Sequence, residues 1–173
     1  MPEHEATDAN RTDYGMLRWL WLSGLVVVLD LGTKRLAESH LPYGEPQHIL
    51  PVFNLTLLHN TGAAFSFLAG ASGWQRWFFV ALAIVISIVL IRWLTKLPRQ
   101  DRWLPAGIAL VLGGALGNLH DRIVQGYVVD FLHFHWHQYS FPAFNLADSA
   151  ITVGAIMLAV DLLRGSGDRD SVE

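Results

Sequence analysis

Four apolar stretches divide the chain, over residues 16–31, 77–94, 103–119 and 144–163. A helix that crosses a bilayer needs about 20 mostly apolar residues, with about 17 as the lower limit. Helices also satisfy their own backbone hydrogen bonds, as a lipid environment requires. The first stretch is long enough only if its helix continues through "GTKRLAE". The pattern predicts four transmembrane helices, and "GGALG" in the third predicts close helix packing.

Composition supports a membrane domain. Hydrophobic residues make up 52% of the chain and charged residues 16%, below the roughly 25% charged residues of soluble domains. The net charge of −3 gives no sign of a nucleic-acid partner. The chain has no cysteine, which excludes disulfides, thiolate metal ligands and a cysteine nucleophile. The first stretch lacks a small-residue cleavage pattern, so we expect it to remain as an anchor.

The lysine and arginine distribution predicts the orientation. If the N-terminus is inside, eight of these residues lie in inner segments: Arg11, Arg18, Arg92, Lys96, Arg99, Arg102, Arg164 and Arg169. Four lie in outer segments: Lys34, Arg35, Arg76 and Arg122. We therefore expect one membrane domain over 16–164, polar cytoplasmic termini at 1–15 and 165–173, and outer segments at about 35–73 and 120–143.

The first outer segment contains "HILPVFNLTLLHNTGAAFSFLAG", which is rich in β-branched and aromatic residues. This composition predicts short strands, with a turn near Asn60–Gly62. An apolar, extended platform outside the helices is expected to rest on the membrane surface.

Polar residues gather at the predicted outer ends of the apolar stretches. They are Asp30, Lys34, Asn118, Asp121, Arg122, Asn145 and Asp148. A charged side chain at membrane depth costs ~2.5–3.5 kcal/mol on insertion scales, so such residues usually face a polar interior and mark function. Each has a structural alternative: Asp30 and Lys34 fit a helix-end ion pair, and Asn145 fits an N-cap. Seven at one membrane depth favour a functional site.

Pairs of aspartates suggest a specific chemistry. Two carboxyl groups held close together share one proton, because like charges disfavour each other in a low-dielectric site. One can then act as a base on water while the other polarises a carbonyl, which is peptide hydrolysis without a metal. Asp30, Asp121, Asp130 and Asp148 are candidates. Spacing alone leaves open whether the partner of Asp148 is Asp130 or Asp121.

Three other functions compete with this one. His133, His135 and His137 alternate in "HFHWH" and could form a metal-dependent hydrolase site, although an interfacial alternation of aromatic and polar residues is the favoured interpretation. A transporter subunit would need a polar path, whereas the inner halves of the stretches are almost wholly apolar. A non-enzymatic assembly protein would tolerate neutral residues in place of the aspartates. The chain has no H-E-x-x-H or G-x-S-x-G motif.

Four blocks resemble the bacterial lipoprotein signal peptidase (signal peptidase II) family, in the family's order. They are "LDLGTK" (29–34), "HNTGAAFS" (59–66), "GGALGNLHDRIVQGYVVDF" (113–131) and "FNLADSAITVG" (144–154). The resemblance implies an all-α membrane protein, with four transmembrane helices and a small extracytoplasmic β-rich cradle. It also implies an aspartic endopeptidase that cleaves diacylglyceryl-modified prolipoproteins just before the lipidated cysteine.

The resemblance also implies roles for individual residues. It assigns catalysis to Asp130 and Asp148, and not to Asp121. Supporting or substrate-binding positions are Asp30, Lys34, Asn60, Asn118, Arg122 and Asn145. It implies no cofactor, no metal and no nucleic acid; the expected partners are prolipoproteins, membrane lipids and globomycin-type inhibitors. The expected location is the bacterial inner membrane, with the site near the outer leaflet.

Overall fold

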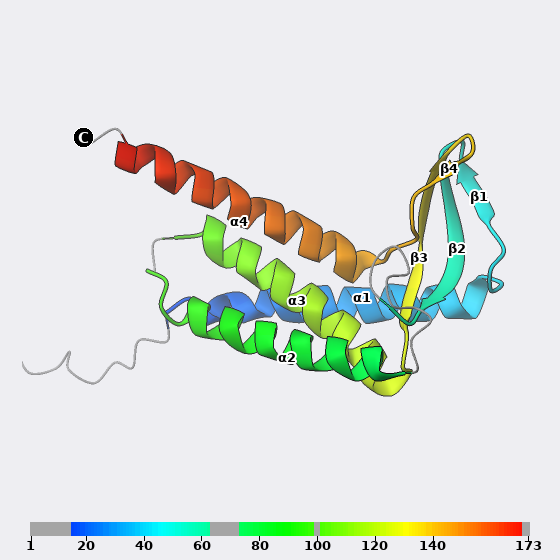
Figure 1. Cartoon of the computed structure of the whole chain (residues 1–173), viewed down its shortest axis with the longest axis horizontal. Coiled ribbons are helices and arrows are strands. Elements are labelled where there is room, and N and C mark those ends of the chain that lie inside the picture. Colours follow the sequence, from blue (N-terminus) through cyan, green and yellow to red (C-terminus); the bar gives the residue numbers. More distant parts are fainter. Residues whose placement is uncertain (1–14, 63–72, 99–100, 171–173) are drawn as a thin grey trace, which may run out of the picture.

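A computed structural model describes residues 15–62, 73–98 and 101–170, with side chains as far as Arg164. The predicted N-terminal segment lies almost wholly outside these residues, as do residues 63–72 of the first outer segment. The described chain is mostly helical, with one small sheet at one end of the helices (Figure 1).

Four long helices form the body of the molecule. They are α1 (Leu20–His40), α2 (Trp74–Leu94), α3 (Trp103–Val124) and α4 (Leu146–Asp170), and a short 3-10 helix, η1 (Leu17–Trp19), precedes α1. The first helix does continue through "GTKRLAE", as the sequence required. The third runs beyond residue 119 to Val124, so Asp121 and Arg122 are helical residues. The last helix begins at Leu146 and extends into the segment expected to be a polar terminus.

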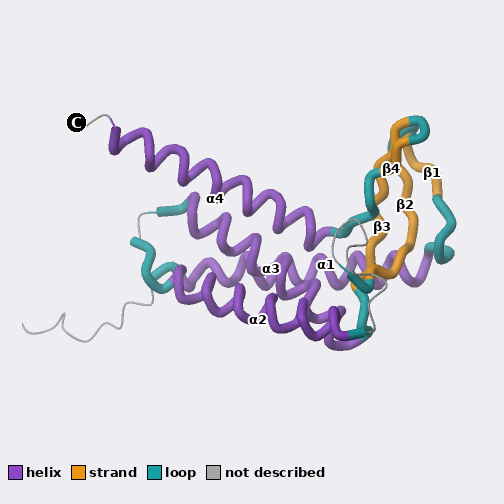
Figure 2. The backbone as a smooth tube through the Cα atoms, in the orientation of Figure 1, coloured by secondary structure: helices purple, strands orange, loops and turns teal. Residues whose placement is uncertain are grey.

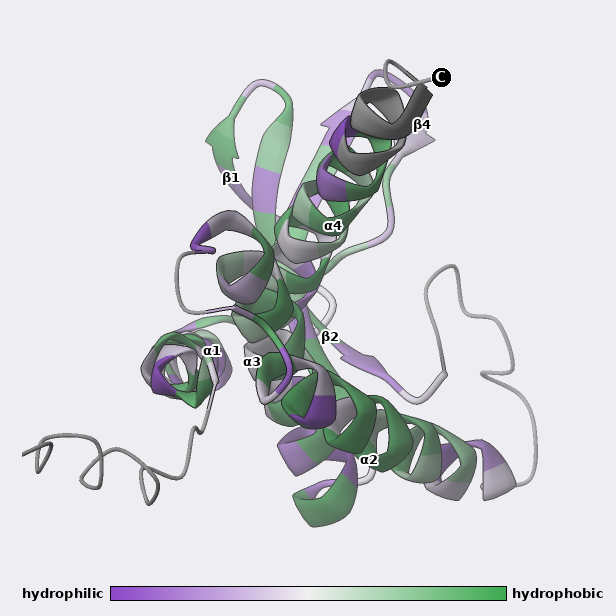
Figure 3. Cartoon of the chain, turned by 90° about the vertical axis from the view of Figure 1, so that its left-hand side faces the viewer, coloured by the Kyte–Doolittle hydropathy of each residue, from purple (hydrophilic) through white to green (hydrophobic). Residues whose placement is uncertain are grey.

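Among the described residues, three helices are long and apolar enough to cross a membrane: α2, α3 and the Leu146–Arg164 part of α4. Figure 3 shows hydrophobic residues along most of α2, where Trp77 is 60% exposed and Val85 56%. Such apolar exposure is typical of a lipid-facing surface. The helix α1 has a similar length but carries charged residues, and it is not among the three.

Glycines on α3 bring its neighbours close. A Cβ at Gly113 would lie 2.7 Å from Cβ of Val26 on α1, and one at Gly114 would lie 2.7 Å from Cγ1 of Ile151 on α4. Only glycine allows such approach, which confirms the packing predicted from "GGALG". The helix α3 is therefore the centre against which α1 and α4 are placed.

The sheet has four antiparallel strands in the order β1 (Gln47–Leu50), β2 (Phe53–Asn60), β3 (Val128–Trp136) and β4 (Tyr139–Ser140), gathered at one end of the molecule (Figure 2). The strands expected in the first outer segment are confirmed. The predicted turn is also present, because Oδ1 of Asn60 accepts a hydrogen bond from the backbone N–H of Gly62 at 3.0 Å. The second outer segment supplies the other two strands.

The strand β3 presents different residues to its two faces. Val129 and Phe131 pack with Leu57 and with Ala37 near the end of α1. Since successive strand residues point to opposite faces, Asp130 is directed away from this cluster. The end of α1 thus supports one face of the sheet while the other face carries the carboxylate.

Candidate active site

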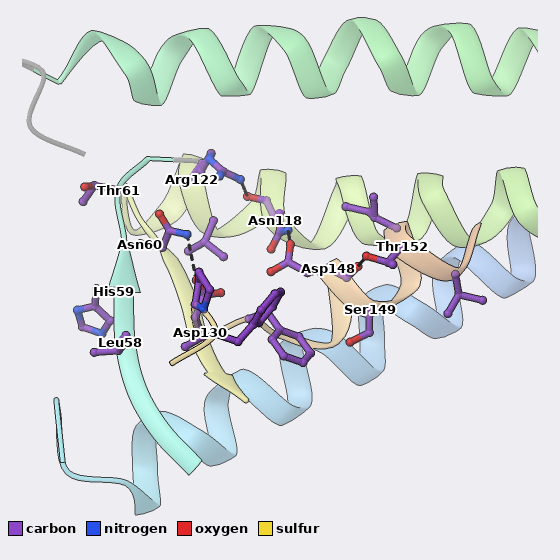
Figure 4. Close-up of a pocket in the computed structure, with 17 residues that line it drawn as sticks. Leu58, His59, Asn60, Thr61, Asn118, Arg122, Asp130, Asp148, Ser149 and Thr152 are labelled. Carbon is purple, nitrogen blue, oxygen red and sulfur yellow. Dashed lines mark hydrogen bonds between the residues drawn. The ribbon is translucent and has the colours of Figure 1, made fainter. Parts of the chain in front are cut away.

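A cavity of about 850 Å³ opens where the sheet meets α3 and α4. Its polar lining residues include Asn60, Asn118, Arg122, Asp130 and Asp148 (Figure 4). Its apolar lining residues include Phe141, Phe144, Ile151 and Val153. Five of the eight residues singled out by the resemblance therefore meet at one cavity. The arrangement joins a polar centre to an apolar wall.

Asp130 is buried and held by two asparagines. Only 3% of the residue is exposed. Nδ2 of Asn60 donates to its Oδ2 at 3.0 Å, and Nδ2 of Asn145 donates to its Oδ1 at 2.8 Å. Burial, and after it the nearby charge of Asp148, raise the pKa of Asp130 to about 7, while the two asparagine bonds and the charge of Lys34 oppose the rise. This carboxyl group therefore exchanges its proton near neutral pH.

Asp148 lies in the first turn of α4 and is half-buried. Its Oδ1 accepts a hydrogen bond from Nδ2 of Asn118 at 2.7 Å. Its backbone N–H donates to Oδ1 of Asn145 at 2.9 Å, which confirms Asn145 as the N-cap of α4. Because the NH₂ group of Asn145 also donates to Asp130, this fully buried side chain links the two carboxylate-bearing elements.

Behind the cavity is a buried ion-pair network. Nζ of Lys34 lies 2.7 Å from Oδ2 of Asp30 and 2.8 Å from Oδ2 of Asp121. The i, i+4 pair predicted from the sequence is present, but it is buried rather than exposed at a helix end. Asp121 points to Lys34 and is not among the described residues that line the cavity. The geometry therefore brings Asp130, and not Asp121, to the cavity with Asp148.

Arg122 extends along the cavity from the last turns of α3. Its Nη1 donates to the carbonyl oxygen of Asn118 at 3.3 Å, and its Nη2 donates to that of Gly62 at 3.1 Å. Its guanidinium carbon lies 5.1 Å from the ring centre of Phe79, within cation–π distance. These contacts fix a positive charge at the edge of the carboxylate pair.

Two of the three alternating histidines, His133 and His135, lie on β3 and are engaged elsewhere, whereas His137 follows the strand. Nδ1 of His133 lies 3.0 Å from the hydroxyl of Thr56, and its Nε2 lies 2.6 Å from that of Ser140. Nε2 of His135 lies 3.2 Å from Oδ1 of Asn54. Along β3 these positions alternate with that of Asp130, so they occupy the other face of the strand. Within the described ranges, no group of three or more His, Asp or Glu residues is placed to hold a metal ion.

Sequence reasoning missed part of the lining. Ser149 and Thr152 face the cavity from α4, and Phe141 and Phe144 form its wall before that helix begins. The spacing of Asp148 and Thr152, four residues apart on a helix, was an available signal. The aromatic wall had no local signal, because it depends on how the β4–α4 connection folds back.

Comparison with known proteins identifies the family. A family model described as signal peptidase (SPase) II matches residues 22–164. A lipoprotein signal peptidase of Pseudomonas putida is 53% identical over 161 residues, covering 92% of this chain and 94% of that protein. One of Acinetobacter baumannii is 57% identical over 145 residues, covering 84% of this chain and 82% of that protein.

Solved structures agree with this result. One, described as a bacterial membrane enzyme at 2.3 Å resolution, superposes with a TM-score of 0.80 at 32% sequence identity. The match covers 90% of this chain and 93% of the chain of that structure. Another, described in the same way at 1.9 Å resolution, gives a TM-score of 0.75 at 33% sequence identity. The match covers 87% of this chain and 96% of the chain of that structure. The fold and these matches define a membrane protease. The chain belongs to the signal peptidase II family, the lipoprotein signal peptidases, which cleave the signal peptides of lipoproteins.

Proposed function

We propose that this chain is an aspartic endopeptidase that acts on diacylglyceryl-modified prolipoproteins and cleaves just before the lipidated cysteine. The observation that carries the proposal is the meeting of Asp130 and Asp148 at one cavity, from a strand and a helix that Asn145 links. The family membership supports the substrate class, and the buried position of Asp130 supports the chemistry.

The proposed reaction uses one proton shared by the two carboxyl groups. A pKa of about 7 at Asp130 favours a singly protonated pair near neutral pH. The ionised carboxylate takes a proton from water, and the water oxygen attacks the scissile carbonyl carbon. The protonated carboxyl group donates to the carbonyl oxygen as the tetrahedral intermediate forms. Proton transfer to the amide nitrogen then breaks the C–N bond and releases an acid and an amine.

The other cavity residues suit a peptide that leaves a helical conformation in the membrane. An amide without its helical hydrogen bond needs polar partners, because an unpaired amide in an apolar medium is costly. Asn60, Asn118 and Arg122 offer such groups at the cavity edge. The apolar wall formed by Phe141 and Phe144 suits the hydrophobic or lipid-bearing part of the substrate. A globomycin-type inhibitor is expected to occupy the same cavity.

The same proposal includes four membrane-spanning helices, with both termini in the cytoplasm of a bacterium and the cavity near the outer leaflet of its inner membrane. Eight lysines and arginines in the inner segments against four in the outer segments support this orientation. Two charged residues of α1, Asp30 and Lys34, are compatible with a fourth span, because they are 0% and 2% exposed and so do not face lipid.

Cleavage is expected to be unaffected by a chelator. The test is a gel-shift assay with purified protein and a diacylglyceryl-modified prolipoprotein in detergent micelles, with and without EDTA. Equal rates support the aspartic mechanism. Loss of cleavage with EDTA would favour a site at His133, His135 and His137, and no cleavage by folded protein would favour the assembly-protein hypothesis.

Activity is expected to fall as the pH rises through about 7. The working form of the pair carries one proton, and a pKa of about 7 at Asp130 means that this proton is lost above that pH. The measurement is kcat/KM for cleavage between pH 5 and 9, with the folded fraction checked at each pH. A rate that increases steadily through pH 7 would show that the fully ionised pair is the active form and would contradict the mechanism.

A further inference from the structure

A buried ammonium group lies behind the carboxylate pair, and three oxygen atoms surround it. Nζ of Lys34 contacts Oδ2 of Asp30, Oδ2 of Asp121 and, at 3.0 Å, Oδ1 of Asn118. An ammonium has three donors and no acceptor, and here it makes one hydrogen bond to Asn118 and ion pairs with the two aspartates. A charge removed from water is costly unless its partners are held in good geometry. Lys34 and its three acceptors are therefore fixed together.

The first acceptor holds the start of α4. Oδ1 of Asp30 accepts a hydrogen bond from the backbone N–H of Ala147 at 2.9 Å. Ala147 directly precedes Asp148 and is fully buried. The position of Asp148 is thus tied through Asp30 to Lys34 on α1.

The second acceptor holds the start of β3. Oδ2 of Asp121, the same oxygen that contacts Lys34, accepts a hydrogen bond from the backbone N–H of Val129 at 3.3 Å. Val129 directly precedes Asp130 and is also fully buried. The two halves of the pair are therefore held in the same way, each through the backbone N–H of the preceding residue.

The third acceptor is Asn118, and its contact with Lys34 sets the orientation of the Asn118 side-chain amide. Oδ1 of Asn118 accepts from Lys34 and from Nδ2 of Asn145, at 3.0 and 3.2 Å. With its oxygen held by two donors, Asn118 must present its NH₂ group to Asp148, which it does at 2.7 Å. The opposite orientation would place two oxygens together and leave the ammonium with one acceptor fewer.

We propose that Lys34 is the positioning residue of the carboxylate pair. Through Asp30 and Asp121 it sets the separation of the two backbone segments, and through Asn118 it supplies a donor to Asp148. This inference rests on the proposed function and gives Asp121, a candidate catalyst by spacing alone, a positioning role instead.

The test is Lys34→Met, which keeps an unbranched side chain as far as the Cε position and removes the ammonium group with its charge. We expect kcat to fall roughly 10- to 100-fold, as for a small misplacement of reacting groups, with KM changed less than about threefold. The charge of Lys34 lowers the pKa of Asp130, so its loss is expected to move the alkaline limb of the pH profile to higher pH. A folded variant with the parent's kcat and pH profile would overturn the proposal.

Ser23→Ala is the matched control. Its hydroxyl donates to the carbonyl oxygen of Ala109 at 2.8 Å across the same α1–α3 contact, away from the cavity. This control should keep the parent's kcat and pH profile. If it loses as much activity as Lys34→Met and shifts the profile equally, the effect is general loosening of the helix contact and the proposal fails.

Lys34→Met leaves two buried carboxylates without their cation, so its folding is measured by thermal unfolding in micelles. If it does not fold, the variant Lys34→Met/Asp30→Asn/Asp121→Asn removes all three charges while keeping an acceptor for each backbone N–H. The expected result is a folded protein with at least a tenfold lower kcat, because Asn118 has lost its orienting donor. Parental kcat in this variant would overturn the proposal, as would failure to fold in both variants, since Lys34 would then determine the fold as a whole.

Failure of this inference differs from failure of the proposed function. If Asp130→Asn and Asp148→Asn keep activity, the aspartic mechanism is wrong whatever Lys34 does. If these two lose activity while Lys34→Met keeps it, the mechanism stands and only the positioning role is wrong.

Discussion

Asparagine in place of Asp130 or Asp148 is expected to lower kcat for prolipoprotein cleavage by about 10²- to 10⁴-fold, the range for loss of a general acid or base. Either substitution removes one of the two carboxyl groups that the proposed reaction needs to exchange protons with the reacting water and the scissile amide. Asparagine keeps the size of the side chain and one acceptor oxygen, so the Asn118 bond to position 148 can still form. The measurement is the rate of substrate conversion in micelles, beside thermal unfolding of each variant.

The matched control for these two variants is Asp161→Asn. It makes the same chemical change on α4, at the end of the helix away from the cavity. The control should cleave at the parental rate. Activity within severalfold of the parent in folded Asp130→Asn or Asp148→Asn would remove that residue from the mechanism, and an equal loss in Asp161→Asn would make the effect non-specific.

Alanine in place of Gly114 is expected to lower both stability and activity. The added Cβ would collide with the carbonyl oxygen of Ala147 and with the side chain of Ile151. A backbone atom cannot turn aside as a side chain can, so the start of α4 must move away from α3. Overpacking of this kind costs about 1–3 kcal/mol, and the resulting shift of Asp148 is expected to lower kcat about 100-fold.

Gly32→Ala separates this effect from a general response to glycine loss. A Cβ at Gly32 has no atom within 4 Å, so this variant should gain about 0.5–1 kcal/mol of helix stability and keep its activity. Thermal unfolding and cleavage in micelles measure both quantities. If Gly114→Ala behaves like Gly32→Ala, the close approach of α3 and α4 does not position the site.

Much of the fold was predictable because its signals are local. The apolar stretches gave the helices, the β-branched residues gave β1 and β2, and Asn60 gave the turn. The extension of α1 through "GTKRLAE" was also expected. The end of α3 was placed too early because apolar residues give way to polar ones near Asn118, although the helix continues. Those polar residues are buried against other polar groups, which a one-dimensional pattern does not show.

The same limit applies to the site. The position of Asn145 is compatible with an N-cap as an alternative to a functional role, and the structure shows the capping hydrogen bond as well as a bond to Asp130. Spacing could not decide whether Asp121 or Asp130 is the partner of Asp148. The answer depends on which of the two carboxylates forms the ion pair with Lys34, a residue that is far from both in the sequence. The pairing of Asp30 with the start of α4 is equally distant. The resemblance to a family supplied an assignment that spacing could not.

The long-range contacts of Lys34 also have a consequence for biosynthesis. A chain is made from its N-terminus, so Asp30 and Lys34 leave the ribosome with only each other as partners. Asp121, Asn118 and Ala147 follow much later in synthesis. Under the proposal that α1 is the fourth span, the first helix carries polar groups that the membrane disfavours until these residues arrive, and the docking of the later helices removes this penalty. Nascent chains that stop before α4 therefore keep this network incomplete, because Asp30 still lacks the backbone N–H of Ala147.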